Sequence, residues 1–318
     1  MSAIVRVSAP SRLHFGLLRF AQQAGLSFGG LGMTIREPRT IVELQLAPEW
    51  QAAGPLAERA LAFAKRAVQS CETYLDSAFH IRVCKAPPPH SGLGTGTQLA
   101  LAVARGVREL LQLPALDAAG LAACVGRGKR SAVGSHGFLQ GGLIWETGRP
   151  AAASLGVLAR RVEIPAHWRV LLCSLPQQPG LHGEREAAAF ESLPPVPEEV
   201  TTELIRLAEE AILPAAEAAD FATFADAVHD YGRLAGSCFT AVQGSSFASP
   251  AIGHLVGQLR EHGIRGVGQS SWGPTVFALA ADAAQAATFA ERARALDDCE
   301  VLIAAPDNKG AIVEEIAP

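Results

Sequence analysis

The glycine-rich segment His90–Gln98 (HSGLGTGTQ) carries residues suited to binding an anion. Gly92, Gly94 and Gly96 can adopt positive φ and let backbone amides approach a ligand without an intervening Cβ. The following residues open a helix, whose unpaired N–H groups and dipole favour a negative charge. The segment therefore predicts a phosphate-binding loop, with an ordinary glycine-rich turn as the alternative. It matches neither the Walker A nor the Rossmann pattern, because no Gly-Lys-Ser/Thr follows and the third glycine spacing differs.

A second stretch, residues 126–137 (GRGKRSAVGSHG), places Arg127, Lys129 and Arg130 within four positions, interleaved with glycines. Flexible glycines let these cations wrap an anion, and arginine suits bidentate recognition of phosphate or carboxylate. A solvated basic loop is the alternative. His136 is a candidate general acid or anion ligand, although an isolated histidine is more often structural.

Two further segments carry polar groups beside aromatic ones. Residues 266–280 end a strand in Gln269-Ser270-Ser271 before Trp272, which suits an aromatic or sugar ligand. The alternative there is a hairpin with a buried Trp. In residues 11–17 (SRLHFGL), strand alternation puts Arg12, His14 and Gly16 on one face, directed either into a cleft or outward from an edge strand.

Composition limits the class of protein that presents these segments. The 318 residues are 49% hydrophobic and 18% charged, which is typical of a globular protein with a well-filled core. The net charge of −4 gives no support to a nucleic-acid or membrane-surface partner. Six scattered cysteines without metal-finger spacing, and a start without an apolar signal region, indicate a cytoplasmic enzyme with reduced thiols.

The elements that position the segments follow from hydrophobic periodicity. Helices are expected at 56–74, 97–113, 198–213, 221–235 and 283–295. Strands are expected at 4–9, 12–18, 40–46, 79–84, 138–145, 170–174, 263–269, 275–280 and 300–304. A small-residue linker at 147–158 favours two domains, residues 1–160 and 161–318.

The four segments, in this order, resemble the GHMP kinase superfamily. Its phosphate loop, Pro-x3-Gly-Leu-Gly-Ser-Ser-Ala, is similar to Pro88-x3-Gly92-Leu93-Gly94-Thr95-Gly96-Thr97. Within it, SRLHFGL, GLGTGTQLALA, GRG and above all GVGQSSWGPTVF resemble the β-ribofuranosylaminobenzene 5′-phosphate synthase family. The resemblance implies an α+β fold of two domains: an N-terminal α/β domain with a left-handed-type βαβ phosphate loop, and a C-terminal ferredoxin-like domain.

One departure from the kinases favours the synthase branch. The kinases carry Ser-Gly-x-Asp after the second loop to activate the acceptor hydroxyl, whereas Ser131–Phe138 contains no Asp or Glu. The synthase resemblance implies a reaction that needs no such base: phosphoribosyl diphosphate is joined to 4-aminobenzoate, or a 4-hydroxybenzoate-like acid, and diphosphate and CO2 are released. Such a step serves tetrahydromethanopterin biosynthesis.

The resemblance also implies roles for the residues. Arg12, His14 and Arg127 are the expected catalytic residues, and Gln269, Ser270, Ser271 and Trp272 are expected to bind the aromatic acid. The expected phosphate-binding residues are Gly92, Gly94, Thr95, Gly96, Thr97, Gln98, Lys129, Arg130 and Ser131. Here the chain departs again, since Lys129-Arg130-Ser131 stands where Gly-Gly-Thr-Ser-like residues are expected after GRG. Mg²⁺ is expected with the diphosphate and no organic cofactor is implied, while a homodimer stays open.

Three alternatives remain open at this point. Within the segment at 182–191, Glu184 and Glu186 are weak candidates for Mg²⁺ ligands, together with His182, or they form the exposed first turn of a helix. An ATP-dependent small-molecule kinase would need a carboxylate from elsewhere, such as these two glutamates. A non-catalytic anion-binding protein is the third possibility.

Overall fold

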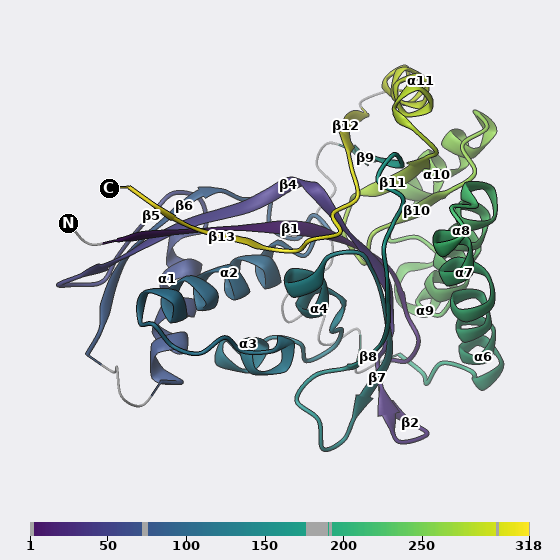
Figure 1. The fold of residues 1–318 in the computed structure, drawn as a ribbon. Coiled ribbons are helices and arrows are strands. Elements are labelled where there is room, and N and C mark those ends of the chain that lie inside the picture. Colours follow the sequence, from purple (N-terminus) through teal and green to yellow (C-terminus); the bar gives the residue numbers. More distant parts are fainter. Residues whose placement is uncertain (1–2, 72–75, 176–189, 191–192, 297–298, 318) are drawn as a thin grey trace.

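Eight strands of the first half, together with the C-terminal strand, build the larger sheet of the computed structural model, which describes residues 3–71, 76–175, 190, 193–296 and 299–317. Along its path the order is β13-β1-β4-β7-β3-β2, with β6 and β5 added at β4 and β8 at β7 (Figure 1). The strands are β1 (Ile4–Leu17), β2 (Gln22–Gln23), β3 (Leu26–Ser27), β4 (Gly30–Ala47), β5 (Gln51–Ala53), β6 (Ala78–Lys85), β7 (Leu143–Pro150), β8 (Val157–Val162) and β13 (Ile312–Ile316).

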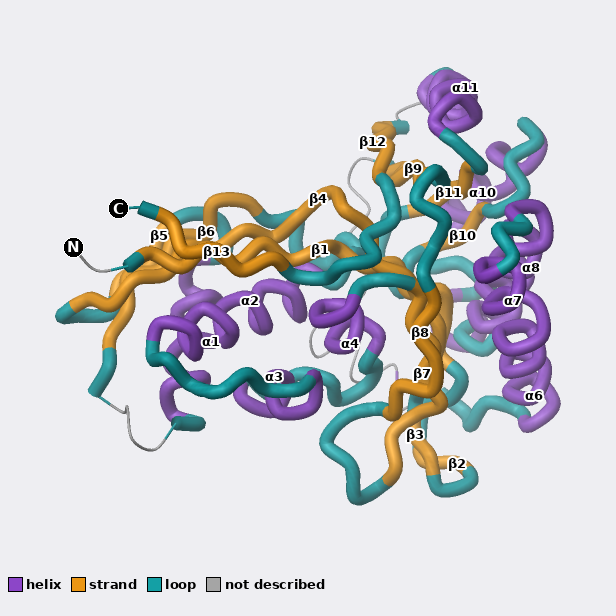
Figure 2. The backbone as a smooth tube through the Cα atoms, viewed as in Figure 1, coloured by secondary structure: helices purple, strands orange, loops and turns teal. Residues whose placement is uncertain are grey.

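Four helices pack on one face of this sheet: α1 (Ala57–Gln69), α2 (Thr95–Leu110), α3 (Ala118–Cys124) and α4 (Val133–Gln140). Figure 2 shows them gathered beneath the strands. The apolar stripe of α2 is fully buried between the sheet and α1, which fixes the direction of this helix. Its N-terminus, the end that attracts anions, therefore lies where β1 crosses toward the second half of the chain.

The second half builds a four-stranded antiparallel sheet in the order β10-β11-β9-β12. Its strands are β9 (Arg169–Ser174), β10 (Val267–Gln269), β11 (Val276–Ala280) and β12 (Glu300–Ala304). Its helices are α6 (Glu198–Arg206), a π-helical stretch η2 (Leu207–Ile212), α7 (Leu213–Glu217), α8 (Phe221–Ser237), α9 (Thr240–Gln243), α10 (Pro250–Glu261) and α11 (Ala283–Arg294). The β-α-β-β-α-β succession with this strand order is the ferredoxin-like arrangement, and it confirms the predicted α+β class.

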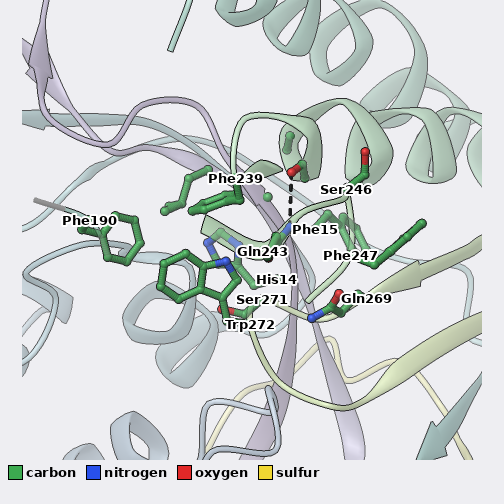
Figure 3. A pocket seen from close by; sticks show the side chains of 15 residues that line it. His14, Phe15, Phe190, Phe239, Gln243, Ser246, Phe247, Gln269, Ser271 and Trp272 are labelled. Carbon is green, nitrogen blue, oxygen red and sulfur yellow. Dashed lines mark hydrogen bonds between the residues drawn. The ribbon is translucent and has the colours of Figure 1, made fainter. Parts of the chain in front are cut away.

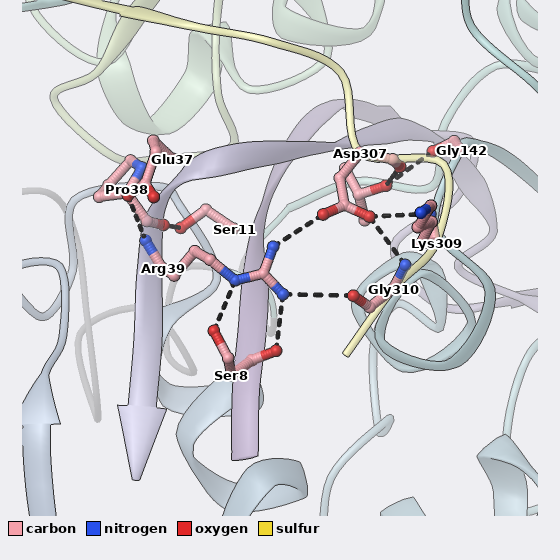
Figure 4. A network of polar contacts seen from close by, with 10 residues as sticks. Ser8, Ser11, Glu37, Pro38, Arg39, Gly142, Asp307, Lys309 and Gly310 are labelled. Carbon is pink, nitrogen blue, oxygen red and sulfur yellow. Dashed lines mark hydrogen bonds and ion pairs between the residues drawn. The ribbon is translucent and has the colours of Figure 1, made fainter. Parts of the chain in front are cut away.

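A buried polar network holds the chain where it returns from the second sheet to the first (Figure 4). Arg39 donates to Ser8 Oγ at 2.7 Å and to Asp307 Oδ2 at 2.8 Å. Asp307 in turn accepts hydrogen bonds from the amides of Lys309 and Gly310. Because both charged groups are largely buried and paired, the network fixes the segment that leads into β13, the antiparallel neighbour of β1. The domain division at 160/161 stays a prediction.

The predicted elements agree with the structure except at a few places. The strand predicted at 138–145 is wrong in its first part, because Phe138–Gln140 forms the last turn of α4. Gly141 and Gly142, both at positive φ, separate that turn from β7. The two N-terminal strands are one continuous strand, β1, with a register shift between Ala9 and Ser11. Helices α3 and α10 were not predicted, although Asp117 and Ser249 cap them in the usual way. The other elements without a predicted counterpart are α4, α9, β2, β3, β5, β8 and β13.

No helix within the described ranges is both long and apolar enough to cross a membrane.

Candidate active site

A cavity of about 210 Å³ opens at the N-terminus of α2. The helix begins after Gly94, whose φ of 77° is left-handed and whose position offers no side-chain cap to the first amides. Arg12 on β1 reaches the loop, where its Nη1 donates to Gly92 O at 2.5 Å. The cavity is lined by Arg12, Arg59, His90, Ser91, Gly92, Gly94, Thr95, Gly96, Thr97, Arg127, Ser271, Trp272 and Gly273. Three guanidinium groups and a helix N-terminus thus face one space, and no described Asp or Glu lines it.

Arg59 and Arg127 converge on Gly96 in the first turn of α2. A Cβ on Gly96 would lie 2.8 Å from Arg59 Nη2 and 3.5 Å from Arg127 Nη2. Burial lowers the pKa of Arg127, and the neighbouring guanidiniums of Arg59 and Arg66 lower it further. Arg127 Nε is buried and has no hydrogen-bond partner among the described residues. Like charges held together around an unsatisfied donor are stabilised by a bound anion.

The remaining residues predicted to bind phosphate lie in different surroundings. Thr95 and Thr97 both line the cavity, and the Thr95 hydroxyl donates to Pro88 O. Gln98 does not line it, and its side-chain amide donates to Gly134 O. Lys129 is exposed and lines neither this cavity nor the apolar one described next. Arg130 lies with its guanidinium 4.6 Å from the centre of the Phe190 ring. Of the three clustered cations, only Arg127 faces the loop cavity.

A second, apolar pocket adjoins the first (Figure 3). Trp272 stacks on Phe190 with ring centres 4.8 Å apart and meets Phe239 edge-on at the same distance. Trp272 Nε1 is buried without a partner among the described residues. The pocket is about 60 Å³ and is lined by His14, Phe15, Gly16, Leu17, Phe190, Gly232, Ala235, Gly236, Phe239, Gln243, Ser246, Phe247, Gln269, Ser271 and Trp272. Ser271 and Trp272 line both cavities, so this dipeptide forms the boundary between them.

The turn that carries this boundary is locked onto the phosphate loop. Buried Ser270 donates to Gly92 O at 2.7 Å and accepts from the His14 amide at 3.1 Å. A Cβ on Gly273 would lie 2.2 Å from Gly92 Cα, so the two backbones touch where only glycine fits. Gln269 uses its amide within the turn, donating to Gly273 O and accepting from the Ala248 amide. Ser270 therefore shapes the site without lining it, Gln269 both holds the turn and lines the apolar pocket, and Ser271 and Trp272 line both cavities.

His14 lies at the apolar pocket, 3% exposed, and is joined to a buried acid. Its Nε2 is 2.9 Å from Ser131 Oγ, and Ser131 donates to Glu146 Oε1 at 2.6 Å. Burial lowers the pKa of His14 to about 3, with a further contribution from the charge of Arg12. Burial raises the pKa of Glu146 to about 7, partly offset by hydrogen bonds from Ser131 and from the backbone. A histidine held neutral in this way is a poor partner for a carboxylate or phosphate.

Sequence reasoning missed Arg59 and Glu146. Arg59 sits in the first turn of α1, and no motif links it to the loop 31 or more positions later. Glu146 lies beyond the stretch Ser131–Phe138 and is the lone acid in the buried strand β7, a signal in the sequence that points to it. His136 is buried in α4, with Nε2 2.9 Å from Gly156 O, and lines neither cavity.

The metal candidates Glu184, Glu186 and His182 lie outside the described residues. Within the described part of the chain, no group of three or more His, Cys, Asp or Glu is placed to hold a metal ion.

Comparisons with known proteins agree with this geometry. The family model described as GHMP kinases N terminal domain matches residues 57–140, and the one described as GHMP kinases C terminal matches residues 212–298. The chain is 29% identical to a β-ribofuranosylphenol 5′-phosphate synthase of Methanothermobacter thermautotrophicus, with 86% of this chain and 88% of that protein covered. A protein of the same name from Archaeoglobus fulgidus is 28% identical, with 98% of this chain and all of that protein covered.

Solved structures share the fold at lower identity. A mevalonate pyrophosphate decarboxylase from Streptococcus pyogenes has a TM-score of 0.68 at 12% identity, covering 96% of this chain and 97% of that one. A homoserine kinase from Cytophaga hutchinsonii has a TM-score of 0.67 at 14% identity, covering 98% of this chain and 97% of that one. At these identities the likeness concerns the fold alone.

Proposed function

The chain belongs to the GHMP kinase superfamily, and from that premise we propose that it is a decarboxylating phosphoribosyltransferase. It joins phosphoribosyl diphosphate to a para-substituted benzoate, 4-aminobenzoate or 4-hydroxybenzoate, and releases diphosphate and CO2. One observation carries the proposal: an arginine-lined cavity and an aromatic-lined pocket adjoin at Ser271 and Trp272. A site that joins an anionic sugar to an aromatic ring needs these two surroundings side by side.

The arginine-lined cavity would hold the phosphorylated donor. As the anomeric C–O bond breaks, negative charge develops on the diphosphate, and Arg12, Arg59 and Arg127 with the first amides of α2 would stabilise it. The absence of any described Asp or Glu from the lining favours a polyanion over a metal-bound or cationic group.

The aromatic pocket would hold the acid. Because Ser271 and Trp272 line both cavities, a ring in this pocket would project past Trp272 toward the arginine-lined cavity. The ring carbon that bears the carboxylate then meets the anomeric carbon at the boundary. That carbon attacks, and CO2 leaves in place of the proton that an ordinary aromatic substitution would lose. No base is needed at the reacting carbon.

The names of the relatives bear on the para substituent. They describe a ribofuranosylphenol product, which corresponds to 4-hydroxybenzoate, whereas the synthase branch that the motifs resemble uses 4-aminobenzoate. Both groups donate electrons to the attacking carbon. We place the reaction in tetrahydromethanopterin biosynthesis, with either acid as substrate.

Mg²⁺ belongs to the proposal as a companion of the diphosphate rather than as a resident ion. Arginine side chains, not carboxylates, surround the loop cavity, so its described residues do not supply the carboxylate ligands by which proteins usually hold Mg²⁺. Charge neutralisation is therefore assigned to the arginines.

The kinase alternative rests on the shared fold and needs a carboxylate beside the acceptor hydroxyl. No described Asp or Glu lines either cavity, and Glu146 is fully buried with its oxygens occupied by Ser131 Oγ and the Ala132 amide. The phosphoribosyltransferase is therefore favoured. The non-catalytic alternative makes the same anion-binding prediction and differs only in turnover.

The deciding experiment follows labelled CO2 from carboxyl-labelled 4-aminobenzoate and 4-hydroxybenzoate. Release is expected only when phosphoribosyl diphosphate is present, together with a ribosylated product detected by mass spectrometry. Unsubstituted benzoate is the matched control and should release little CO2, because its ring carbon is less nucleophilic. Folded protein that releases no CO2 from either acid would overturn the proposal. ATP consumption with an alcohol would point to the kinase instead.

A further inference from the structure

We infer that His14, Ser131 and Glu146 form a proton relay at the apolar pocket, which takes the proton of the acceptor's para hydroxyl group during attack and returns it when CO2 leaves. The inference rests on the proposed function, since it assigns the end of the pocket where the para substituent binds. It makes proton transfer the specific task of His14, a residue expected from the sequence to be catalytic.

The hydrogen-bond directions define the relay. Ser131 Oγ accepts from the Val133 amide at 3.2 Å and gives its single proton to Glu146 Oε1. Toward His14 Nε2, 2.9 Å away, the hydroxyl oxygen must therefore accept, so Nε2 carries the proton. In neutral imidazole the other nitrogen, Nδ1, is then an acceptor. No described residue hydrogen-bonds Nδ1, and His14 lines the apolar pocket.

Such an acceptor selects for a donor on the ligand. A para hydroxyl or amino group on a ring that packs against the aromatic wall of Trp272 and Phe239 can supply a hydrogen to Nδ1, whereas a carboxylate cannot. The pocket thus orients the ring with its para substituent inward and its carboxylate outward. That orientation turns the carboxylate-bearing carbon toward the arginine-lined cavity, as the reaction requires.

The surroundings explain why the proton does not stay on His14. Burial and the nearby Arg12 disfavour imidazolium, so a proton gained at Nδ1 must be matched by one lost from Nε2. Ser131 receives that proton and passes its own to Glu146, whose burial favours the neutral acid. Two further groups face this region, Tyr231 of α8 and Arg19. Burial, and then the charge of Glu146, raise the pKa of Tyr231, whereas the charge of Arg19 lowers the pKa of Tyr231. Neither hydrogen-bonds Glu146 within the described part of the chain.

With 4-hydroxybenzoate as the acceptor, each bond that forms is matched by a bond that breaks. The para O–H bond breaks and its proton enters the relay, while the ring carbon forms a C–C bond to the anomeric carbon. The anomeric C–O bond breaks and its electron pair leaves with the diphosphate. In the resulting dienone, the C–CO2 bond breaks and its electron pair restores the aromatic ring. The phenolate oxygen then takes the proton back from His14, and Glu146 is again a carboxylate.

The relay makes the rate depend on pH in a stated direction. Glu146 must be ionised to accept the proton, so kcat with 4-hydroxybenzoate should rise as pH increases through about 7, the pKa of Glu146. If Glu146 had only a structural role, kcat would not rise with pH in this range.

Ser131 offers the sharpest test, because it is partly exposed and its two variants differ in one group. Ser131→Ala removes the link between His14 and Glu146, whereas Ser131→Thr keeps the hydroxyl. We expect S131A to lower kcat with 4-hydroxybenzoate by about 10²-fold or more and to abolish the rise of kcat with pH. S131T should keep both the wild-type kcat and its pH dependence. Circular dichroism and thermal unfolding verify that each variant is folded. If folded S131A has an unchanged kcat and an unchanged pH dependence of kcat, the relay is overturned.

A chromogenic ligand separates the relay from the proposed function. 4-Hydroxy-3-nitrobenzoate carries the same carboxylate and para hydroxyl, and its phenolate absorbs visible light. Titrated while bound to the protein without phosphoribosyl diphosphate, it should ionise at lower pH in the wild type and S131T than in S131A. Equal titrations in all three proteins would contradict the relay even if turnover occurs. A clear difference without any turnover would leave the relay standing and remove the transferase.

Discussion

The two adjoining cavities of this site are built in opposite ways. The arginine-lined cavity rests on one continuous segment, residues 90–98, whose glycines and following helix create an anion site from the backbone. The apolar pocket has no such segment: its rings come from Phe190, Phe239 and Trp272, far apart in the sequence. Backbone geometry makes the first cavity, and side-chain packing makes the second.

The difference separates binding from orientation. Anion binding at a helix N-terminus depends on amides and guanidiniums that accept many phosphorylated ligands, which is consistent with the variety of activities on this fold. An aromatic-lined pocket with the ring of His14 in its wall is selective for ring shape and for a substituent that can hydrogen-bond. In this chain the first cavity would supply affinity for the donor, and the second would decide which acceptor reacts.

The largest effect is expected from a substitution that removes an arginine from the arginine-lined cavity. Arg127→Ala removes a guanidinium that faces the phosphate loop and should lower kcat/KM for phosphoribosyl diphosphate by about 10²- to 10³-fold. Lys129→Ala is the matched control, since it removes the same charge from the same segment at an exposed position, and it should stay within about threefold of the wild type. Steady-state kinetics measure both. Equal losses in the two variants would mean that net charge, rather than the cavity, attracts the donor.

The next largest effect is expected where the turn that carries Trp272 packs against the phosphate loop. Gly273→Ala places a methyl group against the Gly92 backbone, and we expect a loss of about 2–4 kcal/mol in the free energy of unfolding. Gly257→Ala is the control, because a Cβ there meets nothing within 4 Å and the residue lies in α10. It should stabilise the protein by about 0.5–1 kcal/mol. Urea unfolding gives both values, and a G273A protein as stable as the wild type would show that the two turns do not touch.

The contrast between the cavities also explains what the sequence could predict. The loop at 90–98 was found because its chemistry is local: glycines followed by a helix produce the same anion site in any fold. The ferredoxin-like sheet was expected from the family resemblance, and the order of strands and helices agreed with it. In the same way, GVGQSSWGPTVF marked the turn that the structure brings against the phosphate loop.

What could not be predicted depends on contacts between distant segments. Arg59 enters the cavity only because α1 packs beside α2, and periodicity alone does not fix which residue of a helix reaches a neighbouring loop. The link from His14 to Glu146 spans 132 positions and passes through Ser131, so no spacing rule reveals it. The strand predicted over residues 138–145 failed locally, since its apolar residues suit a buried helix turn equally well.

The smallest expected effect tests where the boundary between the cavities belongs. Trp272→Phe keeps an aromatic ring but removes part of its area and the unpartnered indole N–H. We expect KM for the aromatic acid to rise by about 5- to 10-fold, which corresponds to about 1–1.4 kcal/mol. KM for phosphoribosyl diphosphate should change less, because the proposal assigns donor binding mainly to the three arginines that line the other cavity.

Phe239→Leu provides the comparison, since Phe239 lines only the apolar pocket and should affect the acid alone. The ratio of the two KM changes, measured for both variants, therefore reports how much of Trp272 serves each cavity. A W272F protein whose KM rises more for the donor than for the acid would assign the indole to the anion site. In that case Trp272 would act by donating a hydrogen bond from Nε1 to a phosphate or ribose oxygen rather than by stacking on the ring of the acid. Trp272 would then belong to the anion site, and that cavity would depend on a side chain of the second half as well as on the backbone of the loop.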